Sequence, residues 1–190
     1  MRSRRLLIPA LVLATAAVAS ADTLEMQVRR ARVSFKSEAP LETINGRTTQ
    51  ASGTFRVDPT NLAGARGTIT VPVASLRTGI ELRDEHLHGP DWLDAGSHPN
   101  ATFEITGVSG ASSLTPNQDT NVTLRGNFTI HGVSRPVTAR TRVKWDGGTR
   151  LQGRSQFTVK LEDHGIDIPA IVEAKVSNEI TVRIDFQAST

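Results

Sequence analysis

The sequence predicts an all-β fold, an eight-stranded antiparallel up-and-down barrel with a short helical insertion around residues 76–96. Three observations lead to this prediction. Most of the chain after residue 21 alternates polar and apolar side chains with a period of two, as half-buried strands do. Turn signals such as Asp58-Pro59 and His131-Gly132 separate the alternating runs. One densely charged segment, between Pro72 and Pro99, breaks the alternation.

Eight runs are expected to form the strands. The run 150–161 is the clearest, because Leu151, Phe157 and Val159 fall on one face while charged and amide side chains fall on the other. The runs 122–130 and 136–145 alternate in the same way. In chain order, the predicted strands are 28–37, 51–58, 66–73, 101–108, 122–130, 136–145, 150–161 and 179–186.

The charged segment between Pro72 and Pro99 is expected to be helical. Ile80, Arg83, Asp84 and Leu87 have helical spacing, and the residues after Pro90 suit one further turn. The segment therefore predicts one short helix or two, inserted between the third and fourth strands.

Strands with one polar and one apolar face form either a two-sheet sandwich or a closed barrel. Hairpin-like connections between consecutive runs favour up-and-down order, and closure removes unpaired strand edges. Small inward residues such as Gly126 and Gly153 either leave room for a small ligand or accommodate bulky neighbours such as Trp145 and Phe128. The composition alone does not decide between these two interpretations.

If the barrel holds a ligand, the predicted lining is the inward-facing set of side chains. Its members are Phe103, Ile105, Val122, Leu124, Gly126, Phe128, Ala139, Thr141, Val143, Gly153, Ser155, Phe157, Val159, Ile180, Val182 and Ile184.

The N-terminus reads as a secretory signal peptide. Residues 1–21 combine three early arginines, an apolar run and a final Ala19-Ser20-Ala21 that fits a cleavage site. A transmembrane anchor is disfavoured because the apolar run is short and ends in small residues. The paired arginines leave twin-arginine export open as an alternative to the general route. We expect a single barrel domain over residues 22–190, located in the periplasm or secreted, without a stable membrane anchor.

Composition excludes several function classes. Without the three early arginines, basic and acidic residues are equal in number, so the high isoelectric point is no argument for nucleic acid. The absence of Cys excludes disulfides, thiolate metal sites and a Cys nucleophile. No nucleophile-elbow, P-loop or dinucleotide-binding motif is present, so we expect a binding protein with no catalytic residues.

The histidines do not predict a metal site. On a helix, the rings of His86 and His88 would point about 200° apart, whereas zinc pairs prefer i, i+4 spacing. His131 and His164 lie far along the chain. We expect no metal, with Asp84 and His86 orienting the helical segment by hydrogen bonds and Arg83 pairing with a carboxylate.

Three motifs in order resemble the YceI family, lipocalin-like proteins often described as polyisoprenoid-binding. They are SLRTGIELRDEHLHGPDWLDA at 75–95, LRGNFTIHGVSRPV at 124–137 and QFTVKLEDHGI at 156–166. The resemblance covers roughly residues 28–187. The residues of the first block that match the family motif are Thr78, Gly79, Arg83, Asp84, His86, Leu87, Trp92, Leu93 and Asp94.

The resemblance implies a lipocalin-like barrel that carries or stores an elongated apolar amphiphile, such as an isoprenoid, a quinone or a fatty-acid-like lipid, with no other cofactor. It implies a small apolar lipid as partner. No nucleic-acid partner is expected, and a homodimer stays open. The alternative is a solid-cored structural or interaction barrel of the cell envelope; a hydrolase-type enzyme ranks below both.

Overall fold

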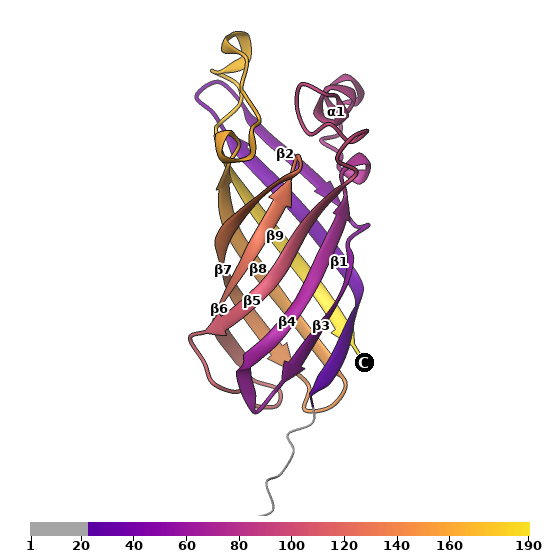
Figure 1. Ribbon diagram of the computed structural model, residues 1–190, viewed down its shortest axis with the longest axis vertical. Helices are drawn as coiled ribbons and strands as arrows, with labels where there is room; N and C mark the ends of the chain where they lie inside the picture. Colours follow the sequence, from indigo (N-terminus) through magenta and orange to yellow (C-terminus); the bar gives the residue numbers. More distant parts are fainter. Residues whose placement is uncertain (1–22) are drawn as a thin grey trace, which may run out of the picture.

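A computed structural model describes residues 23–190, and these residues form a closed antiparallel β-barrel (Figure 1). The signal peptide predicted over residues 1–21 lies outside the described residues. The strands are β1 (Leu24–Glu38), β2 (Thr43–Thr48), β3 (Ser52–Asp58), β4 (Asn61–Pro72), β5 (Asn100–Ser109), β6 (Asp119–Ile130), β7 (Val133–Trp145), β8 (Arg150–Lys160) and β9 (Glu179–Ser189). The helices are α1 (Glu81–His88) and the short 3₁₀ helices η1 (Val73–Ser75), η2 (Glu162–His164) and η3 (Ala170–Val172).

Strand β1 closes the barrel. It pairs with β9 from Gln27 to Ser37, while its N-terminal part pairs with β3 and its C-terminal part with β2. From β3 to β9, each strand pairs with the next one in the chain. The predicted up-and-down barrel is therefore confirmed, with eight strands in the closed ring and β2 as an extra strand beside β1.

Strand β2 is not among the strands predicted from the sequence. Its sequence, Thr-Ile-Asn-Gly-Arg-Thr, holds one large apolar residue, Ile44, so it shows no clear alternation. Pairing with β1 holds it in place, and a backbone bridge joins Arg47 to Arg77. β2 thereby extends the wall of the barrel beyond β3 on the side of α1.

The inserted segment contains a single α-helix, shorter than the range 76–96. Helix α1 carries Glu81 and Asp84 in its first turn and two histidines in its last, an arrangement that complements the helix dipole. It ends at His88, because Gly89, the residue before Pro90, takes an extended conformation as residues before proline do. Asp91–Asp94 form turns and not a second helix.

The inward faces of the strands form two apolar clusters that follow one another along the barrel axis. One cluster lies at the end that carries α1 and the β8–β9 connection, and the other lies at the opposite end, where the C-terminus is found (Figure 1). Phe55, Val108, Leu124 and Phe186 pack against both clusters. Within residues 23–190, no helix has the length and apolar character needed to cross a lipid bilayer.

Candidate ligand-binding cavity

A cavity of about 300 Å³ occupies the half of the barrel nearest α1. Inward side chains of β1, β4, β5, β6, β8 and β9 line its walls. Residues of α1 and of the β8–β9 connection border it at the end of the barrel. The volume falls at the lower end of the range of small-molecule pockets, roughly 300–1,000 Å³.

A second, smaller cavity of about 80 Å³ lies in the other half of the barrel. Ile69, Phe103 and Ile184 border both cavities, so their side chains lie between the two spaces. The interior is therefore neither one open tunnel nor fully solid. Most of the free space is at the α1 end.

Aromatic rings form one wall of the larger cavity. Phe103 stacks on Phe157 with ring centroids 5.5 Å apart, and Phe128 meets Phe157 edge-on at 5.2 Å. Phe128 in turn meets the ring of His164 at 5.6 Å. The wall thus runs from Phe103, between the cavities, to His164 in η2.

His164 is buried, and its orientation is fixed by one hydrogen bond. Its Nδ1 lies 2.9 Å from the carbonyl oxygen of Val133, and because a carbonyl only accepts, Nδ1 is the donor. Among residues 23–190, no side-chain or backbone group is hydrogen-bonded to Nε2. His164 therefore brings a polar atom to the end of an otherwise apolar wall.

Charged residues gather at the α1 end of the cavity. Arg83 donates from Nη2 to Glu42 Oε1 at 2.6 Å, which joins α1 to the β1–β2 connection. His86 and Lys175 also border the cavity there. The cavity thus combines apolar walls with a charged mouth.

Asp84 holds the start of α1. Its Oδ1 accepts hydrogen bonds from Thr78 N at 2.6 Å and Thr78 Oγ1 at 2.7 Å. Burial raises the pKa of Asp84, but the Thr78 hydrogen bonds and the charges of Arg77 and His88 outweigh burial, so the pKa lies below its ordinary value.

The predicted roles of Asp84 and Arg83 match these contacts, whereas that of His86 does not. Among the described residues no side-chain hydrogen bond of His86 is found, since its ring is exposed. The neighbouring His88 donates from Nε2 to the carbonyl of Leu76 at 2.9 Å instead. Of the other motif residues, Thr78, Leu87, Trp92 and Leu93 border the cavity. Gly79 has a left-handed φ of 88° just before the helix.

The predicted lining residues fall mostly on the two cavities. Phe128, Phe157, Val159, Ile180 and Val182 border the larger one, and Phe103 and Ile184 border both. Those that border the smaller one alone are Ile105, Val122, Leu124, Thr141, Val143 and Ser155. Their role in ligand binding stays a prediction.

Gly126, Ala139 and Gly153 border neither cavity. A Cβ at Gly126 would lie 2.8 Å from Cζ of Phe103, and one at Gly153 would lie 2.8 Å from Cζ of Phe186. These glycines accommodate aromatic neighbours, which is the second of the two interpretations that the sequence left open. The cavity comes from elsewhere, at the end covered by the inserted segment.

Three further side chains meet outside the cavity. Asp94, His98 and His131 place their potential metal-ligating atoms within 4.8 Å of one another. Hydrogen bonds from Ser97 lower the pKa of Asp94, and His98 and His131 lower it further by their charge. This cluster was not predicted from the sequence, because neither the His-Gly turn nor the His-Pro pair reveals that two distant loops meet.

The YceI-like domain family matches residues 24–188. A UPF0312 protein of Vibrio parahaemolyticus is 31% identical over 166 residues, which is 85% of each chain. One of Pseudomonas paraeruginosa is 34% identical over 127 residues, but the match covers only 62% of that relative.

Solved structures share the fold. The crystal structure of BcnA from Burkholderia cenocepacia superposes with a TM-score of 0.72 at 22% identity, covering 84% of this chain and 96% of that one. A polyisoprenoid binding domain from Saccharophagus degradans superposes with a TM-score of 0.69 at 17% identity, covering 87% and 98%. The family match, which spans almost every described residue, shows that the chain belongs to the YceI-like domain family.

Proposed function

We propose that the protein binds an elongated apolar amphiphile, an isoprenoid, quinone or fatty-acid-like lipid, and acts as its carrier or store. The observation that carries this proposal is the 300 Å³ cavity, with its apolar walls and charged mouth. The Saccharophagus degradans structure, which is described as polyisoprenoid binding, supports the same class of ligand.

The proposal includes an orientation of the ligand. Its hydrocarbon part lies along the Phe103–Phe157–Phe128 wall, and its polar end lies near Arg83, His86 and Lys175. Burying one methylene contributes about 0.8 kcal/mol, so ten contribute roughly 8 kcal/mol before association and ordering costs. Micromolar affinity follows without any strong polar contact. The mostly apolar walls support binding of a ligand of this class.

A lipid carrier of this kind is consistent with a protein that is exported from the cytoplasm. We propose that residues 1–21 are removed on export and that the mature protein works in the periplasm or outside the cell. The intact mass of the protein recovered from that compartment tests this. A species that retains Met1 in the membrane fraction would contradict it.

The binding proposal is tested by Val159→Phe. Val159 is buried against the larger cavity, so the added ring occupies the space proposed for the ligand. The matched control is Thr158→Phe, which places the same ring one residue away on the outer face of β8. Lipids in an organic extract of the purified protein are identified by mass spectrometry, and uptake of a fluorescent fatty acid is then measured for all three proteins.

We expect wild type and Thr158→Phe to bind and Val159→Phe to lose binding while remaining folded. Absence of any extracted lipid and of uptake by the wild type would overturn the proposal and favour the solid-cored barrel. Equal uptake by Val159→Phe would show that the fatty acid binds outside this cavity.

A further inference from the structure

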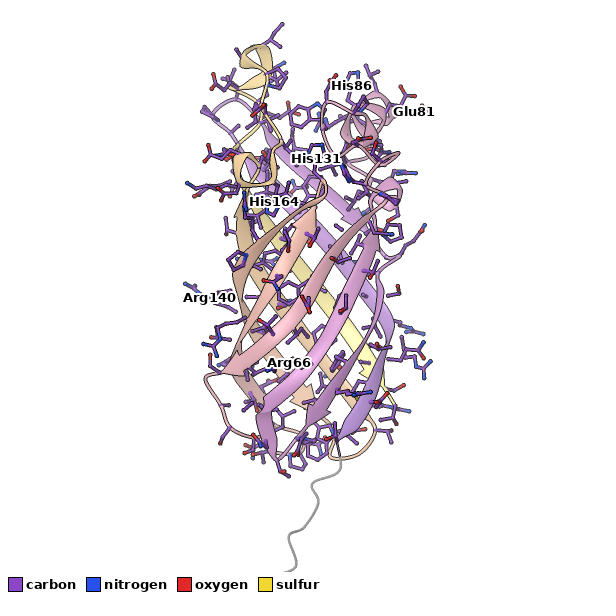
Figure 2. All side chains as sticks on the ribbon, in the orientation of Figure 1. Arg66, Glu81, His86, His131, Arg140 and His164 are labelled. Carbon is purple, nitrogen blue, oxygen red and sulfur yellow. The ribbon has the colours of Figure 1, made fainter. Side chains whose placement is uncertain are left out.

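Two loops at the α1 end of the barrel bring together one carboxylate and two imidazoles. Asp94 and His98 belong to the connection between α1 and β5, and His131 to the tight turn between β6 and β7. The rings of His98 and His131 meet edge-on, with centroids 5.1 Å apart. Figure 2 shows His131 at the same end of the barrel as His164 and His86.

The backbone is held in a costly conformation at this cluster. Asp94 and His131 have φ of 42° and 52°, and among residues 23–190 only Asn117 shares such a left-handed conformation without being glycine. A two-residue hairpin turn of this geometry favours Asn-Gly or Asp-Gly. Here His131 takes the Asn position before Gly132, which has φ of 71°. A histidine in that place suggests a use for its ring.

The ring of His131 is oriented by a neighbour. Its Nδ1 lies 3.2 Å from the carbonyl oxygen of His164, so Nδ1 is the donor and Nε2 is left for a ligand. Histidines that bind metals typically donate their other ring N–H to a carbonyl or carboxylate in this way.

His98 and Asp94 are also held in place. The ring of His98 lies directly over Gly132, where a Cβ would be 2.6 Å from Cε1. The backbone N of His98 donates to the carbonyl of Asp94 at 2.7 Å, and Asp94 Oδ1 accepts from Ser97 N at 3.2 Å. Asp94, His98 and His131 are thus each positioned by contacts with neighbouring residues of these loops and of η2.

We propose that Asp94, His98 and His131 form a binding site for a divalent transition-metal ion, with Zn²⁺ as the best fit. Two imidazoles and one carboxylate are a donor set that Zn²⁺ accepts, and three protein ligands leave a fourth position for water. The half-buried ligands leave an entry path from solvent. The site lies outside the lipid cavity, so the proposal goes beyond the proposed function and does not depend on it.

Metal binding would join separate parts of the barrel end. The ion connects the α1–β5 connection to the β6–β7 turn, and the hydrogen bond from His131 extends this link to His164 and η2. A ligand that binds only the folded state raises its stability. We therefore expect Zn²⁺ to raise the melting temperature of the protein.

The test uses the mature chain without an affinity tag, after chelation and removal of the chelator. Zn²⁺ binding is measured by calorimetric titration, and Co²⁺ is added separately because its visible absorption reports tetrahedral coordination. His131→Asn suits the left-handed turn and removes the imidazole without disturbing the hairpin. His98→Asn is the second variant. The control is His86→Ala, an exposed histidine on α1 at the same end of the barrel.

We expect one Zn²⁺ per chain, a rise in melting temperature and a tetrahedral Co²⁺ spectrum. His131→Asn and His98→Asn should each weaken binding by about tenfold or more, whereas His86→Ala should bind like the wild type. No binding by the wild type, or binding that survives in the His98→Asn/His131→Asn double variant, would overturn the proposal. Binding that is lost in His86→Ala would also overturn it and place the ion on α1.

Discussion

The ring of Phe186 lies against the backbone of Gly153, its directly paired residue across β8 and β9. The same relation joins the ring of Phe35 to Gly46 across β1 and β2. Because glycine has no side chain, the ring opposite it can lie directly on the glycine backbone. The barrel wall therefore depends on aromatic and glycine pairs at fixed register.

Substituting Gly153 tests this dependence. A Cβ there would lie 2.8 Å from Phe186 Cζ and 2.9 Å from the carbonyl oxygen of Arg142, so the ring and the backbone must both move. We expect Gly153→Ala to lower the free energy of unfolding by about 1–3 kcal/mol. Gly64→Ala is the control, because no atom lies within 4 Å of its Cβ position, and it should be neutral or slightly stabilising. Urea denaturation measures both, and equal effects would contradict the prediction.

The buried hydroxyl pair of Thr141 and Ser155 predicts an asymmetric response to mutation. Their oxygens lie 2.5 Å apart inside the barrel. Thr141 Oγ1 donates to the carbonyl of Ala139 at 3.3 Å, so Ser155 is the donor within the pair. Thr141→Val leaves the Ser155 hydroxyl without its acceptor and should cost about 1–3 kcal/mol of unfolding free energy.

Ser155→Ala leaves Thr141 its own acceptor and should cost about 1 kcal/mol. The double variant removes both hydroxyls and should be close to wild type in stability. Unfolding free energies of the three variants form a double-mutant cycle. Additive costs in that cycle would show that the two hydroxyls do not depend on each other.

Asp84 predicts a loss of stability in acid. Its pKa in the folded protein lies below the ordinary value of 3.8, so the charged carboxylate favours the folded state. This contribution is complete above that value and is lost as the pH falls through the lower folded pKa. We expect Asp84→Asn to be less stable at neutral pH by about 1–3 kcal/mol, with the difference from wild type shrinking in strong acid.

Acid titrations of the melting temperature measure this change. Asp167→Asn serves as the control, since Asp167 is exposed on the β8–β9 connection. A difference between wild type and Asp84→Asn that stays constant down to strong acid would show that the carboxylate charge is not what holds Thr78.

The ion pair between Arg83 and Glu42 should contribute modestly to the attachment of α1. Both side chains are about one third exposed, at 29% and 33%, so solvent screens the pair. We expect a coupling energy of about 0.5–1 kcal/mol in a cycle of Arg83→Met and Glu42→Gln, smaller at high salt. Hydrogen exchange of the α1 amides should speed up in the single variants. Unchanged exchange there would mean that Asp84 and Thr78 alone hold the helix.

The strands could be predicted because the two faces of the barrel wall differ in polarity. The run 150–161 shows this directly, and the structure places it in β8. Strand β2 could not be predicted, because Gly46 and its polar neighbours carry no alternation and are ordered by pairing with β1 and by the bridge to Arg77. The position of the cavity could not be predicted either. The alternation of polar and apolar residues identifies which residues face inward but not how much space is left between them.

Glycines illustrate the same limit. Gly126 and Gly153 face inward as expected, yet the rings that cover them belong to Phe103 and Phe186, not to Phe128 or Trp145. Which ring lies on which glycine depends on strand register, and register between distant segments is not visible in a single sequence. The meeting of Asp94 and His98 with His131 depends on register in the same way.

The pairing of β1 with β9 also decides when the protein can finish folding. Strand β1 pairs early with β2 and β3, but the ring closes only when β9 is available, since Gln27 pairs with Ser189 and Ser37 with Ile180. Contacts so distant along the chain form slowly. Until they form, β1 has an open sheet edge, and so does β8 as long as β9 has not paired with it. A chain interrupted before β9 is therefore expected to aggregate through these edges.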